Sequence, residues 1–238
     1  MADFLSSGAS KRREERMNKE IRLDEEISVK AYNGVIGCVL IYGLLVNVLM
    51  CYIFQDRVLY MKPGLLIAIQ FIGCIVGSVM SSNSDNPIIS FIGYNFVVIP
   101  MGLVVSACVA LYGGLGSEVV GQAFAITMLT TATMAAFSFA KPEWFERLGN
   151  VLFVGLFGLF IAEMVLIFVG ADQLISSWIA AVLFSLYIGY DFYRAQQFPK
   201  TLDNAVDSAL DVYMDVIILF LRILRILGSK GGGSKGRR

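Results

Sequence analysis

Acidic and basic side chains interrupt a long apolar stretch near the C-terminal end of the sequence, DSALDVYMDVIILFLRILRILG, residues 207–228. Three carboxylates come first and two guanidiniums follow: Asp207, Asp211, Asp215, Arg222 and Arg225. In a helix of 3.6 residues per turn, these five side chains project within an arc of about 80°. An Asp or Arg costs about 2.5–3.5 kcal/mol at a membrane-helix centre, so we expect the charged stripe to face a protein-lined or watery interior. A helix lying flat at the membrane surface is the alternative interpretation.

A fourth carboxylate, Asp191, ends the preceding apolar run in VLFSLYIGYDFYRAQQ. Only a short connection with Pro199 separates the two stretches, so Asp191 can face Asp215, or Asp211 one turn away. Two carboxylates in a poorly solvated site do not both ionise easily, and we expect a coupled pair that acts as a pH switch. The alternative is a routine helix-surface contact between Asp191 and Arg194.

The composition indicates what surrounds these charges. Hydrophobic residues make up 57% of the chain and charged residues only 16%, which is typical of an integral membrane protein. A helix needs about 20 apolar residues to cross a hydrocarbon core of about 30 Å. Six runs have this length: 34–54, 64–80, 88–112, 119–140, 148–169 and 174–190. The charged segment 205–227 is long enough to be a seventh span, so we predict an all-α membrane protein.

The charge distribution predicts orientation and domain organisation. Nineteen basic and nineteen acidic residues cancel, which gives no indication of a nucleic-acid partner. We expect no cleavable signal peptide, a charged cytoplasmic arm at residues 1–30, a membrane domain at residues 31–228 and a flexible basic tail at residues 229–238. Lys and Arg are more frequent on the side of the N-terminal arm, which predicts a cytoplasmic N-terminus in a bacterial cell membrane. The basic tail is at odds with this rule if the seventh helix crosses fully.

Two further features concern ionisable groups. The chain has no histidine, so any pH sensing or metal binding must depend on carboxylates. Glu163, in LFIAEMVLIF, lies deep in the fifth run, where an ionisable residue is a candidate for function. Its alternative role is that of a protonated side chain hydrogen-bonded to a neighbouring helix.

Four stretches together carry a family resemblance: GYNFVVIPMGLVVS, QAFAITMLTTATMAAFS, SLYIGYDFYRAQ and ALDVYMDVIILFLRILRILG. They resemble the Bax inhibitor family, the transmembrane Bax-inhibitor-motif proteins, in a bacterial-type version, over roughly residues 30 to 228. The resemblance implies seven transmembrane helices with a central C-terminal helix wrapped by six others. It also implies a pH-sensitive calcium leak gated by an aspartate pair, which motif position assigns to Asp191 and Asp215.

The sequence departs from the family pattern at three positions. The resemblance implies an arginine at the end of the second helix that holds bacterial relatives closed. The corresponding stretch of this chain, MSSNSDNP, has no basic residue, and Arg194, elsewhere in the chain, is a candidate substitute. Gln122 stands where the pattern often has glutamate. Asp211 adds a negative charge one turn before Asp215, where relatives usually have a small or neutral residue.

These observations favour a channel or transporter over an enzyme. Calcium prefers six to eight oxygens, and Asp191, Asp211 and Asp215 supply part of such a shell, so we expect transient calcium and no tightly bound cofactor. The predicted partners are lipid, calcium and protons. One alternative is a regulator that binds other membrane proteins, such as a membrane protease. An intramembrane aspartyl protease is a less favoured alternative, because the chain lacks the GxGD motif expected around the second aspartate. A proton-coupled antiporter is a further alternative.

Overall fold

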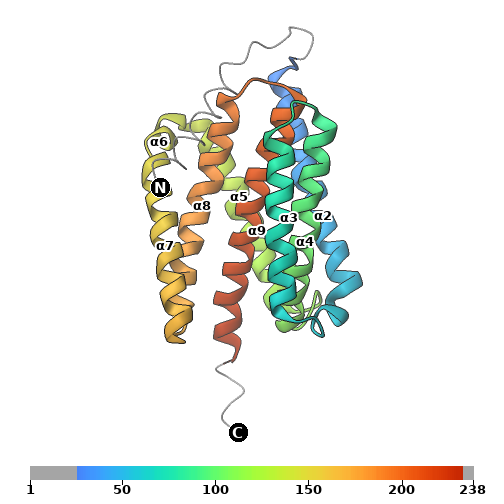
Figure 1. Ribbon diagram of the computed structural model, residues 1–238. Coiled ribbons are helices and arrows are strands. Elements are labelled where there is room, and N and C mark those ends of the chain that lie inside the picture. Colours follow the sequence, from blue (N-terminus) through green and yellow to red (C-terminus); the bar gives the residue numbers. More distant parts are fainter. Residues whose placement is uncertain (1–25, 233–238) are drawn as a thin grey trace.

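The computed structural model describes residues 26–232, which form eight helices and, within these limits, no strand (Figure 1). The helices are α2 (Val29–Val58), α3 (Pro63–Ser82), α4 (Pro87–Leu111), α5 (Glu118–Ala140), α6 (Pro142–Glu146), α7 (Gly149–Val169), α8 (Leu174–Gln197) and α9 (Leu202–Gly232). Most of the predicted N-terminal arm and the tail from residue 233 lie outside the described residues. The helical part extends slightly past both predicted limits of the membrane domain, since α2 begins at Val29 and α9 continues to Gly232.

Six helices, α2, α3, α4, α5, α7 and α8, are long and apolar enough to cross a membrane, and they confirm the six predicted runs. Their outer surfaces are apolar. On α7 the side chains of Phe153, Phe157 and Phe160 are each more than 60% exposed. Large exposed apolar side chains on this scale require a lipid environment, so the chain is an integral membrane protein.

Helix α9 lies in the middle of the bundle, with α8 on one side and α3 and α4 on the other (Figure 1). Its 31 residues correspond to a length of about 46 Å, enough to traverse the whole bundle. Tyr213, Val216 and Leu219 are almost completely buried in the apolar core. The interpretation of this segment as a helix lying flat at the membrane surface is therefore wrong, because the other helices surround it.

The ends of the helices follow from local sequence. Ser28 caps α2, since its Oγ accepts a hydrogen bond from the Ala31 backbone N–H at 3.2 Å. Asn86 caps α4 in the same way, and Pro87 occupies the first helical position, where its missing N–H costs nothing. Helix α7 ends at Gly170, whose φ of +69° is readily adopted by glycine.

Helices α3 and α4 approach each other closely at glycines. A Cβ atom added to Gly77 would lie 2.4 Å from the carbonyl oxygen of Gly93, and one added to Gly93 would lie 2.7 Å from that of Gly77. Small residues allow such contact between membrane helices, where van der Waals packing drives association. The glycines of FIGCIVGSV, residues 71–79, thus allow α3 to pack directly against α4.

The connection between α8 and α9 is fixed to the beginning of α2. The buried Tyr32 hydroxyl donates to the Ala195 carbonyl oxygen at 3.0 Å and lies 3.1 Å from the Ser208 Oγ. The Lys200 Nζ donates to the carbonyl oxygens of Ala195, Gln196 and Phe198 and lies 4.7 Å from the centre of the Tyr32 ring. Burial lowers the pKa of Lys200. These contacts fix the end of α8 against the first turns of α9.

Candidate ion site between α8 and α9

The two aspartates assigned to the pair lie side by side. Asp191 comes from the last third of α8 and Asp215 from the middle of α9, and each is 7% exposed. The Asp215 carboxyl is close enough to that of Asp191 for a side-chain hydrogen bond, while the Asp215 Oδ2 has no hydrogen-bond partner among the described residues. Buried apolar residues such as Ile188 and Val216 lie around the pair. The structure thus brings together the residues that the sequence predicted to face each other.

Arg194 links this pair to the next carboxylate on α9. One Nη lies 3.3 Å from the Asp191 Oδ1, and the same nitrogen donates to the Asp211 Oδ2. The Arg194 side chain is 18% exposed and that of Asp211 is 41% exposed, so the ion pair lies at the edge of the buried site. Asp191 therefore contacts both residues that its two interpretations name, Arg194 three residues on and Asp215, while its action as a pH switch stays a prediction.

The three carboxylates do not form a metal shell. Between residues 26 and 232, no three Asp, Glu, Cys or His side chains are arranged so that they could hold a metal ion. The physical reason is the position of Arg194, which draws the Asp211 carboxylate toward its own guanidinium. Asp211 is paired with Arg194 in this arrangement, and its predicted contribution to calcium binding stays a prediction.

Two further carboxylates continue the row toward the beginning of α9. The Ser90 Oγ of α4 donates to the Asp203 Oδ1 at 2.5 Å, and the Ser81 Oγ of α3 donates to the Asp207 Oδ1. Asp203 and Asp207 are both buried. Sequence reasoning missed Asp203, although its spacing of four residues from Asp207 repeats the spacing of the later acids.

The basic half of α9 has partners on the opposite side of the bundle from α2. Arg222 forms a bidentate ion pair with Glu163 of α7, in which the Nη2 to Oε2 distance is 2.8 Å. The Arg225 Nη1 donates to the Oε1 of Gln173, just before α8, at 2.6 Å. The interpretation of Glu163 as a protonated hydrogen-bonding group is therefore replaced by an ion pair. The sequence signal for this ion pair was the presence of an acid, Glu163, and a base, Arg222, in two otherwise apolar stretches.

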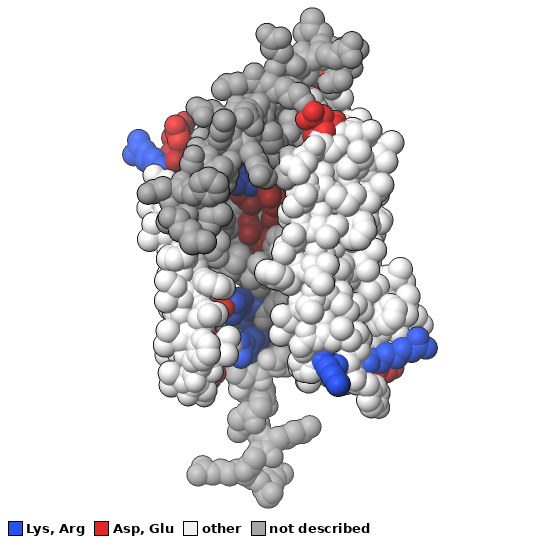
Figure 2. All heavy atoms as spheres, in the orientation of Figure 1, with Lys and Arg blue, Asp and Glu red and all other residues white. Residues whose placement is uncertain are grey.

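The charged side chains gather in a groove. Figure 2 shows acidic and basic atoms in a hollow between α8 and α3, while on the side shown the other charged atoms lie near the ends of the helices. Between Asp211 and Arg225, the partly exposed residues of α9 follow one face of the helix: Asp211, Met214, Ile218, Leu221, Arg222 and Arg225. The predicted stripe thus faces a groove of which α9 forms the floor.

A separate cavity of about 250 Å³ lies on the other side of α9, among α2, α4 and α5. Its lining is apolar apart from Asn47 and Thr127, and it contains no carboxylate. Asn47 instead positions the core, because its Nδ2 donates to the Tyr213 hydroxyl at 2.6 Å. The ionisable groups of α9 lie outside this cavity.

The fold and the site define a class: helical integral membrane proteins in which a charge-bearing central helix contacts each of its six long neighbours. The family model described as "Inhibitor of apoptosis-promoting Bax1" matches residues 28–232. The chain belongs to the Bax inhibitor family.

Similarity to individual curated proteins covers a shorter region. An uncharacterized protein of Helicobacter pylori strain J99 is 30% identical over 118 residues, 48% of this chain and 49% of the relative. Bax inhibitor 1 of Schizosaccharomyces pombe is 31% identical over 115 residues, 47% of this chain and 43% of the relative. Inner membrane protein YbhL of Escherichia coli is 24% identical over 122 residues, 47% of this chain and 52% of the relative. The chain spans about half the length of these relatives.

Proposed function

We propose that this protein is a calcium leak of the membrane, with a pathway along the groove face of α9 and a proton-sensitive element at Asp191 and Asp215. The observation that carries the proposal is the placement of two buried carboxyls from adjacent helices against each other. Because two negative charges in contact repel strongly where water is scarce, the pair shares a proton or binds a cation. Either event changes the charge at the same point of the pathway.

The oxygen-only chemistry of the site suits a hard divalent cation. Calcium accepts carboxylate, carbonyl and water oxygens in flexible geometry. The Asp191–Asp215 pair offers few protein ligands, so a calcium ion there keeps much of its water and leaves readily. Weak binding favours permeation over storage, and the proposal involves no covalent chemistry.

In this proposal Arg194 is the latch, the residue that holds the pathway closed. Its guanidinium lies beside Asp191 and Asp211, where a cation approaching the pair would have to pass. A permanent positive charge at this place repels calcium and neutralises Asp211. Movement of Arg194 away from the groove opens the route, and the closed arrangement corresponds to the ion pair described above.

The proposal includes a topology. Helix α9 crosses the membrane as a seventh span, because it traverses the bundle and its charges have protein partners instead of facing lipid. The higher frequency of Lys and Arg on that side of the bundle favours a cytoplasmic N-terminus and a cytoplasmic start of α9. The carboxylate half of α9 is then nearer the cytoplasm and the arginine half nearer the other surface.

Calcium entry into dye-loaded proteoliposomes from pH 5 to 8 tests the proposal, with wild type, Asp191→Asn and Asp215→Asn. We expect a flux that depends on pH in wild type and loses this dependence in both variants. Glu143→Asn, at an exposed acid on α6, is the matched control and should behave as wild type. Absent flux would refute the leak, and equal flux in all proteins would refute the role of the aspartate pair. Either result would favour a regulator of other membrane proteins, whose activity the aspartates should not affect.

A further inference from the structure

Arg225 carries a charge that no acidic side chain of residues 26–232 balances. Its guanidinium is partly buried and donates one hydrogen bond, to the neutral amide oxygen of Gln173. No carboxylate of residues 26–232 lies within ion-pair distance of it, whereas Arg222, one turn earlier, is balanced by Glu163. A guanidinium has five N–H donors, so most of the Arg225 donors remain available for an anionic acceptor. An uncompensated charge in a poorly solvated place strongly favours an anionic partner.

The position of Arg225 along the bundle corresponds to the level of lipid headgroups. Gln173 lies between the end of α7 at Val169 and the start of α8 at Leu174, where the membrane-spanning helices end. Asp172, the acid in this connection, accepts a hydrogen bond from the Leu174 backbone N–H at 3.1 Å and thus caps α8. The first turn of α8 adds the positive end of a helix dipole to the same region.

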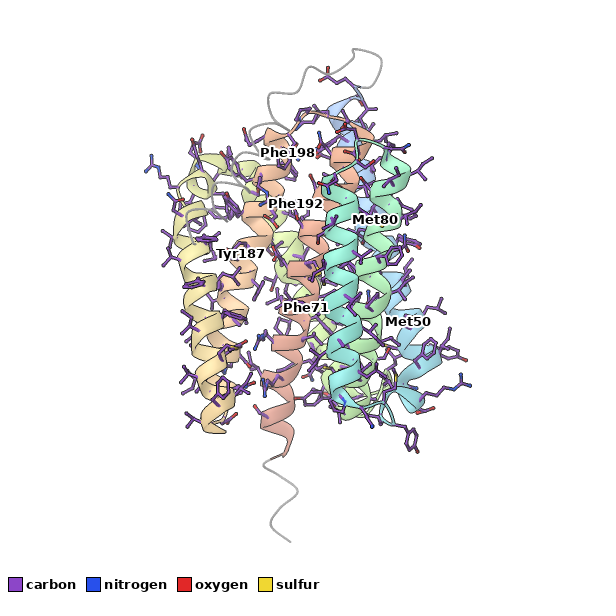
Figure 3. The ribbon with its side chains drawn as sticks, in the orientation of Figure 1. Met50, Phe71, Met80, Tyr187, Phe192 and Phe198 are labelled. Carbon is purple, nitrogen blue, oxygen red and sulfur yellow. The ribbon has the colours of Figure 1, made fainter. Side chains whose placement is uncertain are left out.

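An apolar surface leads from Arg225 toward the middle of the membrane. The partly exposed side chains of Leu221, Ile218 and Met214 line the floor of the groove, and Phe71 projects from α3 on the side of α9 (Figure 3). From Arg225 to Met214 the helix rises about 16 Å. This length is about half of a hydrocarbon core of about 30 Å, which is the depth of one leaflet.

We propose that the groove binds one anionic phospholipid, with its phosphate on Arg225 and an acyl chain along Leu221, Ile218 and Met214. Charge complementarity selects this occupant, since one phosphodiester supplies the single negative charge that balances Arg225. A guanidinium binds phosphate through two parallel, charge-assisted N–H···O hydrogen bonds. The site is separate from the Asp191–Asp215 pair, and the lipid covers the open side of the groove in the arginine half of α9.

Native mass spectrometry of the full chain in detergent tests the site by titration with phosphatidylglycerol or phosphatidylcholine of identical acyl chains. We expect tighter binding of phosphatidylglycerol to wild type. Arg225→Gln should weaken that binding about tenfold and leave phosphatidylcholine binding unchanged. Arg57→Gln removes an exposed cation at the same end of the bundle and outside the groove, and is the matched control. It should retain the preference.

Two further measurements make the outcome decisive. If Arg225→Gln does not fold, Arg225→Lys should keep a reduced preference for phosphatidylglycerol, and Ile218→Trp should weaken lipid binding by filling the groove. Glycerol phosphate in millimolar excess should not displace the lipid. The proposal would be overturned if wild type bound both lipids equally, or if glycerol phosphate displaced the lipid. It would also be overturned if Arg57→Gln lost as much affinity for phosphatidylglycerol as Arg225→Gln.

Discussion

The ion pair between Glu163 and Arg222 joins a peripheral helix to the central one, and its contribution to stability can be measured. Helix α7 buries little of its surface, and Leu152 and Leu159 are its buried residues. The side chains of Glu163 and Arg222 are 21% and 20% exposed, so water screens them only partly. Neutralising one of them leaves the other charge in a place with little water.

The expected magnitude lies between two known limits. Exposed ion pairs contribute about 0–1 kcal/mol, and breaking a fully buried pair costs about 3–5 kcal/mol. With one fifth of each side chain exposed and two hydrogen bonds in the pair, we expect Glu163→Gln or Arg222→Gln to lower the free energy of unfolding by about 2–3 kcal/mol. The double variant should lose about 1.5 kcal/mol less than the sum of the two single variants, because no unpaired charge remains.

Equilibrium unfolding in mixed micelles of a mild detergent and dodecyl sulfate measures these values for wild type, both single variants and the double variant. Glu143→Gln, at an exposed acid on α6, is the control and should stay within about 0.5 kcal/mol of wild type. If the effects of the two substitutions simply add, the side chains do not interact, and the reasoning about α7 and α9 is refuted.

Three other perturbations follow from described contacts. Arg194→Gln should increase calcium flux into proteoliposomes, since it removes the positive charge beside the carboxylates; a lower flux would contradict its role as a latch. Tyr32→Phe should lower the free energy of unfolding by about 1 kcal/mol, because the Ala195 carbonyl loses one of its two side-chain donors and keeps only Lys200; an unchanged unfolding curve would show that this hydroxyl does not hold α2 to α8. Gly77→Ala should destabilise the α3–α4 contact, since its Cβ would lie 2.4 Å from the Gly93 oxygen. Gly37→Ala, with no atom within 4 Å of its added Cβ, should be tolerated, and equal thermal stability of these two variants would refute the packing argument.

The fold follows from the sequence to a large extent, because length and apolarity directly determine which segments can cross a bilayer. All six apolar runs are helices, and the central position of α9 agrees with the family resemblance. The proximity of Asp191 and Asp215 was also predictable, since a short connection fixes the depth of one relative to the other. Helix α6 was missed, because a helix of five residues has too little periodic pattern to be recognised.

The sequence shows opposite charges on separate apolar stretches, but it does not determine which of these charges pair. Glu163 and Arg222 are 59 positions apart, and their contact depends on the order in which the helices surround α9. Hydropathy contains no information about this order. The same limitation applies to Asp211, whose carboxylate had two partners within reach, Arg194 and Asp215. The choice between them depends on side-chain geometry.

The arrangement of charges on α9 has a consequence for biogenesis. Its partners Ser81, Ser90, Glu163, Gln173 and Asp191 all precede it in the chain, so each is synthesised first. A segment too polar to partition into lipid alone can thus leave the translocon directly into a prepared helical shell. Synthesis order and the positions of the polar contacts together make the entry of α9 the step that closes the shell.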